Sequence, residues 1–158
     1  FASLGESARV KNISELIKFN LNDSVELMYF DQQLLEMAQS KGDLNSPEYK
    51  KNLEMMQTGM RKQGIDRIMN EYKLDALVAP TGSPAWKTDL VDGDHFLGGS
   101  SSYAAIAGYP SISVPMGFID GLPVNISFIG KAWSEAELLS IAYSYEQATH
   151  QRKKPMLE

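Results

Sequence analysis

The sequence predicts an α/β fold in which a mixed sheet is flanked by helices. Residues 111–114 alternate polar and apolar side chains at the period of a strand, and residues 124–129 do so again after a Gly-Leu-Pro turn. A long helical pattern leads, within two residues, into the apolar segment 74–79, which Pro80 is expected to end. A helix that feeds directly into an apolar strand is typical of a sheet that helices cover.

The first part of the chain predicts two short helices. Asn12 and Glu15 have the spacing of a capping box, which starts a helix over residues 13–19. A second helix is expected over residues 29–40, where apolar residues recur at helical spacing, and Gly42 closes it.

A long helix follows. Ser46 supplies a capping hydroxyl and Pro47 suits the first helical position, and the apolar pattern continues to about Tyr72. Gly59 and Gly64 interrupt this pattern, and each costs roughly 1 kcal/mol relative to alanine inside a helix. The two glycines therefore predict close packing or a bend.

Residues 81–99 form a long segment without periodicity, rich in glycine, proline and aspartate. Loops of this length are uncommon inside compact domains and are often functional. Two interpretations stay open: the loop borders a substrate site, or it is a surface loop that Trp86 and Phe96 anchor.

The run Asp92, Asp94 and His95 contains three side chains that could bind a metal. No second cluster of ligands accompanies it, so hydrogen bonds that fix the loop are the favoured interpretation. We expect neither a metal nor a cofactor.

Three consecutive serines, Ser100, Ser101 and Ser102, precede a short apolar helix over residues 103–107, which Gly108 ends. Helix capping is the favoured role for these hydroxyls, and lining of a substrate pocket is the second. A nucleophilic serine would need a neighbouring base and oxyanion donors, and this is the least favoured of the three roles.

The remaining elements are a hairpin and a final helix. Pro115 is expected either to end the first hairpin strand or to sit at an unpaired position. Ser134 and Glu137 have the spacing of another capping box, which starts a helix that runs to about His150.

Composition excludes several classes of function. The formal net charge of −5 argues against a nucleic-acid partner, which requires a basic face. No apolar run approaches the roughly 18 residues of a membrane span, so no membrane partner is expected. The absence of cysteine excludes disulfides and thiolate chemistry.

Several linked segments resemble the amidase signature family. SSSYAAIAGYPSISVPMGF, GLPVNISFIGKAWSE and ELLSIAYSYEQATHQRKKP are similar to the carboxyl-terminal end of these enzymes. YFDQQLLEMAQSKGDLNSPEY and LDALVAPTGSPAW resemble the segments that precede it. The resemblance implies a cytoplasmic hydrolase that cleaves carboxamides through a serine, which a second serine and a lysine activate.

The resemblance also implies that residues 1–158 are the carboxyl-terminal part of a larger amidase signature fold. The chain opens at Phe1, inside what looks like the end of a helix over residues 1–4. Neither Lys87 nor Lys131 matches the family's catalytic lysine. We therefore expect the catalytic residues upstream, with none in this chain.

In such an enzyme the substrate would be a small-molecule amide. The residues expected to line its pocket are Trp86, His95, Phe96, Ser100, Ser101 and Ser102. The isolated chain is expected to self-associate through open sheet edges. One alternative is a non-catalytic binding or dimerisation module. Another is a protein like the glutamyl-tRNA amidotransferase component that carries the amidase domain, although the asparagine usual before Ala107-Gly108 in that component is absent here.

Overall fold

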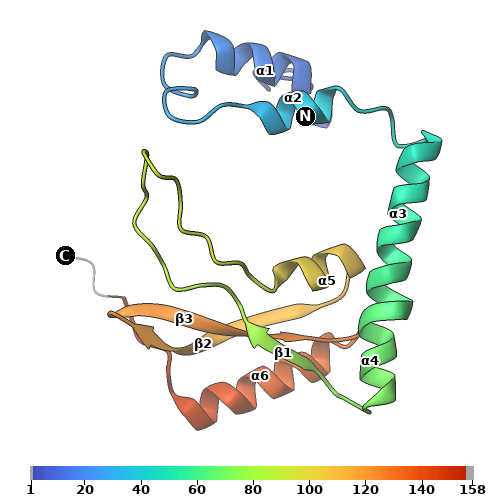
Figure 1. The fold of residues 1–158 in the computed structure, drawn as a ribbon, viewed down its shortest axis with the longest axis vertical. Helices are drawn as coiled ribbons and strands as arrows, with labels where there is room; N and C mark the ends of the chain where they lie inside the picture. Colours follow the sequence, from blue (N-terminus) through green and yellow to red (C-terminus); the bar gives the residue numbers. More distant parts are fainter. Residues whose placement is uncertain (1, 156–158) are drawn as a thin grey trace. The chain divides into compact units, whose positions relative to one another are not determined.

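A computed structural model describes residues 2–155 of the chain. The chain divides into two compact units, Phe1–Lys50 and Lys51–Glu158, and each is described by itself. The first unit is helical, whereas the second contains the sheet with its helices (Figure 1).

The first unit contains the short 3₁₀ segment Ala2–Leu4 and two helices, α1 (Ile13–Asn22) and α2 (Gln33–Gln39). The expected helix end over residues 1–4 is seen from Ala2 onwards, and Phe1 lies outside the described residues. The capping box is confirmed, because Asn12 Oδ1 accepts a hydrogen bond of 2.9 Å from the Glu15 amide. α1 continues one turn beyond the predicted end.

The second helix is shorter than the predicted span of residues 29–40. Asp31 Oδ1 accepts a hydrogen bond of 3.1 Å from the Gln33 amide, and such a local turn lets the helix begin only after it. The buried Gln32 fixes this start against α1. Its side-chain amide donates to the Ile17 carbonyl at 3.3 Å and accepts from Asn20 Nδ2 at 3.2 Å.

The predicted long helix is present but not uniform. α3 (Pro47–Met60) starts with the expected cap, since Ser46 Oγ accepts from the Tyr49 amide at 3.3 Å. The π-helical segment η2 (Arg61–Ile65) follows, and then α4 (Asp66–Glu71). A Cβ atom added to Gly64 would lie 2.8 Å from the Gly59 carbonyl oxygen. The wide turn therefore packs backbone on backbone at Gly64, which explains this glycine, whereas a Cβ atom at Gly59 would meet nothing within 4 Å.

Three strands form one sheet in the order β1-β3-β2, and both pairings are antiparallel. The strands are β1 (Leu77–Pro80), β2 (Ser111–Ile119) and β3 (Leu122–Ile129). The mixed sheet was an expectation for the larger fold, and both strand pairings found within residues 2–155 are antiparallel.

Pro80 ends its strand as predicted, although β1 begins at Leu77 rather than at residue 74. Pro115 does not end its strand, and that expectation is wrong. Pro80 is the last residue of β1, an edge strand, where a missing N–H costs no pairing on the free side. β2 continues past Pro115 to Ile119, with a shift in register between Pro115 and Gly117. A bulge of this kind absorbs a residue that cannot keep the ladder regular.

The sheet has two covered faces. On one face α6 (Glu135–Thr149) packs against β2 and β3, and the buried residues are Val114, Phe128, Leu138 and Ala142. On the other face α5 (Ser101–Ala107) and the η2–α4 region contribute to a second cluster: Ile65, Met69, Ala104, Ala107 and Ile129. Figure 1 shows α5 and α6 on opposite sides of the strands.

The predicted capping box of α6 is wrong. Ser134 makes no side-chain cap to the helix, and its Oγ donates instead to the Lys131 carbonyl at 2.9 Å. Its backbone angles, φ −97° and ψ 24°, depart from the extended geometry that aims a capping hydroxyl at the first amides.

The C-terminal end of α5 is tied to the long helix. Gly108 is left-handed, with φ of 65°, as predicted. Arg61 Nε donates to the Ala107 carbonyl at 2.6 Å, and the Tyr109 hydroxyl donates to Asp66 Oδ2 at 2.9 Å. Burial, together with the hydrogen bond to the Asp66 carboxylate, raises the pKa of Tyr109 above its ordinary value.

Across residues 2–155, no helix is both long and apolar enough to cross a membrane.

Candidate functional site

The loop over residues 81–99 is closed at its base by backbone contacts. Gly82 and Gly99 form an antiparallel bridge, and the Ser83 amide donates to the Gly98 carbonyl at 3.3 Å. The Ser100 amide donates to the Thr81 carbonyl at 3.1 Å. The loop therefore leaves β1 and returns into α5 through a fixed neck.

A hollow of about 360 Å³ opens at this neck, and we call it the loop-base hollow. The end of β1, both sides of the neck and the first turn of α5 form its walls. Its lining residues include Pro80, Ser83, Leu97, Ser100 and Tyr103. Every lining side chain is uncharged, so the hollow suits a neutral polar ligand rather than an ion.

Ser100 is the most deeply placed polar residue of this hollow, with 4% of its surface exposed. It occupies the N-cap position of α5, yet its hydroxyl caps nothing. Its angles, φ −100° and ψ −3°, are close to helical, so the side chain is not aimed back at the first amides. Ser101 and Ser102 lie exposed in the first turn itself. The prediction that these serines cap the helix is therefore wrong.

Two hydroxyls at the hollow have no partner. Ser83 Oγ and Ser100 Oγ are both buried, and neither makes a hydrogen bond within the part of the chain that the structure describes. A buried polar group left unpaired costs about 1–3 kcal/mol, so such groups are rare in native proteins. A ligand, a bound water or a residue outside this chain would supply the missing hydrogen bonds.

A row of paired hydroxyls lies close to the neck. Thr81 Oγ1 is 2.7 Å from Ser127 Oγ and 2.8 Å from Ser113 Oγ, so one threonine links β3 with β2. We call these three residues the hydroxyl row. The two serines fix Thr81 in place, and the Thr81 carbonyl accepts the hydrogen bond from the Ser100 amide.

The aromatic residues of the loop pair with each other. The rings of Trp86 and Phe96 meet edge to face, with centroids 5.9 Å apart and planes inclined at 62°. Both side chains remain exposed, as does His95, which precedes Phe96. Only Ser100, of the six residues predicted to line a substrate pocket, belongs to the loop-base hollow. For the other five, that role stays a prediction.

The acidic tip of the loop stabilises the loop itself. Asp89 Oδ1 accepts from the Val91 and Asp92 amides, at 2.8 Å and 3.0 Å. These backbone hydrogen bonds lower the pKa of Asp89 below its ordinary value. Among residues 2–155, no three histidine or acidic side chains are grouped so as to hold a metal ion.

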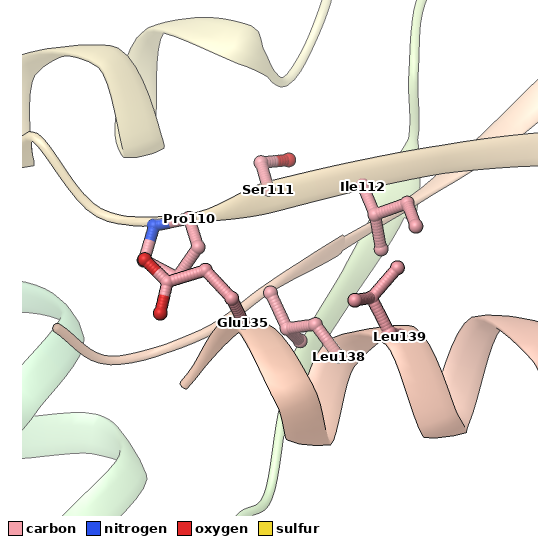
Figure 2. A pocket seen from close by; sticks show the side chains of 6 residues that line it. All are labelled: Pro110, Ser111, Ile112, Glu135, Leu138 and Leu139. Atoms are coloured by element: carbon pink, nitrogen blue, oxygen red, sulfur yellow. The ribbon is translucent and has the colours of Figure 1, made fainter. Parts of the chain in front are cut away.

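A second hollow, of about 250 Å³, lies between the start of β2 and α6 (Figure 2). Figure 2 shows the Glu135 carboxylate beside Pro110, and Leu139 facing Ile112, while the Ser111 hydroxyl points to the other side of the strand. Glu135 is exposed and no unpaired buried hydroxyl lines this hollow. The loop-base hollow is therefore the better candidate site.

Sequence reasoning missed two residues of this site, Ser83 and Tyr103. Tyr103 lies one helical turn after Ser100, so the helix period could have placed both on one side of α5. Nothing local identifies Ser83, because its position depends on the bridge between Gly82 and Gly99.

Comparisons with known proteins agree with one another. The family model described as Amidase matches residues 4–139. A protein of Arabidopsis thaliana described as a probable amidase is 34% identical over 149 residues, which are 92% of this chain and 26% of that protein. A component of the glutamyl-tRNA(Gln) amidotransferase of Symbiobacterium thermophilum is 41% identical over 59% of this chain and 20% of that component.

Among solved structures, native peptide amidase from Stenotrophomonas maltophilia is 42% identical to this chain, with a TM-score of 0.85. The match covers 96% of this chain and 30% of the peptide amidase. The chain thus spans less than a third of the length of each of these relatives.

Proposed function

The chain belongs to the amidase family, and from that premise we propose that it forms part of an enzyme that hydrolyses carboxamides. Water and a carboxamide would give a carboxylate and ammonia or an amine. The serine, second serine and lysine that the family resemblance implies would be supplied from outside these 158 residues. A cytoplasmic location is part of the same proposal.

The unpaired Ser100 hydroxyl is the observation that carries this chain's role. A carboxamide offers a carbonyl acceptor and N–H donors, and a serine hydroxyl can both donate and accept. An amide bound between Ser83 and Ser100 would therefore give both unpaired hydroxyls a hydrogen-bond partner. The uncharged lining supplies no base or acid, so the hollow would position substrate while other residues perform the chemistry.

The size of the hollow agrees with a small substrate. Its volume of about 360 Å³ falls within the usual range for small-molecule sites. Trp86, His95 and Phe96 would border the same substrate from the loop, as would the exposed Ser101 and Ser102 from α5.

The experiment is a chimera in which this chain replaces the matching segment of the Stenotrophomonas maltophilia peptide amidase. We expect the chimera to release ammonia from a short peptide amide. Ser100→Ala should raise KM several-fold with a smaller change in kcat, because it removes a binding contact. Ser140→Ala, which alters an exposed serine of α6 outside the loop-base hollow, is the matched control and should leave KM unchanged.

A folded but inactive chimera would contradict the proposal and favour a non-catalytic binding or dimerisation module. The isolated chain should release no ammonia from the same amides. Turnover by the isolated chain that any one of Ser100→Ala, Ser101→Ala or Ser102→Ala abolishes would show that a nucleophile lies within it.

The second candidate is a component of a glutamyl-tRNA amidotransferase, which would act with a second protein and tRNA. It is favoured by the 41% identity to the Symbiobacterium thermophilum protein. That match covers 59% of this chain, whereas the peptide amidase match covers 96%. An assay of the chimera with glutamine in place of the peptide amide distinguishes the two candidate functions. A preference for glutamine would favour the amidotransferase.

A further inference from the structure

The helix α5 carries two residues of the loop-base hollow. Ser100 lies at its N-cap position and Tyr103 in its first turn, and both line the hollow. α5 has only seven residues, and a helix this short is marginal by itself in water. The neck fixes its first end, where the Ser100 amide donates to the Thr81 carbonyl at 3.1 Å. The direction in which α5 leaves the neck, and with it the placement of both side chains, depends on what holds the other end.

Arg61 holds that other end. Its Nε donates to the Ala107 carbonyl at 2.6 Å, and its guanidinium carbon lies 5.8 Å from the centre of the Tyr109 ring. A Cβ atom at Gly108 would lie 3.3 Å from Arg61 Nη2, so the side chain lies directly against the turn that ends α5. A positive charge at the C-terminal end of a helix also interacts favourably with its last carbonyls.

The π turn η2 explains how Arg61 reaches α5. In an α-helix, residues five apart lie about 140° apart around the axis, since each residue turns by about 100°. In η2 the Asp66 amide donates to the Arg61 carbonyl, so the wide turn closes between these two residues. They therefore come close to the same side of the helix. Both contact the end of α5, Arg61 at the Ala107 carbonyl and Asp66 at the Tyr109 hydroxyl.

We propose that Arg61 is a positioning residue for the loop-base hollow, and that it acts through the Ala107 carbonyl and α5 on Ser100 and Tyr103. Arg61 does not line the hollow, so its effect passes through the helix. The consequence for substrate affinity rests on the proposed function, in which the hollow holds the amide. The contact between Arg61 and α5 lies within one compact unit, Lys51–Glu158.

Arg67 offers a matched control on the same long helix. Its Nε donates to the Gln63 carbonyl at 3.0 Å and its Nη1 donates to Glu71 Oε2 at 3.0 Å, so both bonds stay within η2 and α4. Arg67→Met therefore removes the same charge and the same donors as Arg61→Met without altering a contact to α5.

Amide hydrogen exchange of this chain tests the positioning without any measurement of activity. Arg61→Met should raise the exchange rates of Ser100 and of residues 104–107 at least fivefold, because α5 loses the contact at its end. Residues 138–142 of α6 should change less than twofold, whereas a role in overall stability alone would raise exchange in both helices equally. Arg67→Met should leave both helices unchanged.

The peptide amidase chimera tests the consequence for the substrate. Arg61→Met should raise KM for the peptide amide at least threefold and change kcat less than twofold, because binding weakens while the reacting groups stay in place. A loss of folded enzyme would instead lower kcat and leave KM unchanged. Arg61→Lys keeps the charge and a donor but not the planar guanidinium, and it should recover part of the loss in KM. Arg67→Met should leave KM unchanged.

Should Arg61→Met fail to fold by circular dichroism, Arg61→Lys replaces it, with an expected change of at least twofold in the exchange of α5 and in KM.

Three results would overturn the proposal. They are exchange in α5 that loss of the guanidinium leaves unchanged, exchange that rises equally in α5 and α6, and an active chimera whose KM does not change. An inactive chimera would contradict the proposed function alone, and hydrogen exchange then decides the role of Arg61 by itself.

Discussion

The two faces of the sheet are built from different side chains. The face under α6 is closed by Val114, Phe128, Leu138 and Ala142, all of them apolar. The face under α5 combines apolar residues with the hydroxyl row and adjoins the unpaired hydroxyls of the loop-base hollow. Hydroxyls without partners lower stability, and within the described residues they occur on this side only, which is why this side carries the proposed site.

The largest expected effect tests whether the α6 face depends on packing alone. Leu138 is 1% exposed, and Leu138→Ala should lower the free energy of unfolding by about 2–5 kcal/mol. Urea unfolding measures this loss. Leu139, its neighbour, is 59% exposed, and Leu139→Ala should cost less than about 0.5 kcal/mol. Equal losses from the two variants would show that α6 does not pack as described.

A smaller effect is expected on the α5 face, where Tyr109 donates to Asp66 at 2.9 Å. Tyr109→Phe should cost about 1.5 kcal/mol at neutral pH, because the acceptor is a carboxylate. An unchanged unfolding midpoint would contradict this hydrogen bond.

The same residue predicts a dependence on pH. Folding raises the pKa of Tyr109, chiefly through burial and then through the hydrogen bond to Asp66. Its contribution is therefore complete below the ordinary pKa of about 10 and is lost as pH rises through the raised pKa. The wild-type chain should lose stability more steeply above pH 10 than Tyr109→Phe. If the free energy of unfolding falls equally with pH in the two proteins, Tyr109 is not the cause of the pH dependence.

The smallest of these effects concerns the hydroxyl row. Ser127 is buried and its Oγ lies 2.7 Å from Thr81 Oγ1, so Ser127→Ala should cost about 1 kcal/mol. Ser113→Ala should cost less, because Ser113 is exposed and water can replace its hydroxyl. The opposite order would show that the row is held from β2 rather than from β3.

Much of the fold could be predicted because its signals are local. The capping box at Asn12, the serine-proline start at Ser46 and the left-handed Gly108 each depend on residues within one helical turn. The effect of proline on strands could not be predicted in the same way. Pro80 ends β1, whereas β2 continues past Pro115 because a register shift there accommodates a residue without an N–H. Strand pairing sets that register at long range.

The site was less predictable for a similar reason. Two roles were predicted for Ser100, lining of a substrate pocket and capping of the helix. The cap was favoured because a serine that precedes an apolar helix usually caps it. The nearly helical angles of Ser100 follow from its backbone bond to Thr81, 19 residues earlier in the chain. Ser83 depends on the same neck. Tertiary contacts, rather than local pattern, decide which hydroxyls stay unpaired.

The most direct test of this difference between the faces is the free energy of unfolding of Ser100→Ala. If the hydroxyl is buried without a partner, its removal should raise stability by up to about 1 kcal/mol. Ser101→Ala, which alters an exposed serine of the same helix, should stay within about 0.5 kcal/mol of the wild type. A loss of about 1 kcal/mol in Ser100→Ala would show that the hydroxyl already has a partner, and the loop-base hollow would no longer stand out as a binding site.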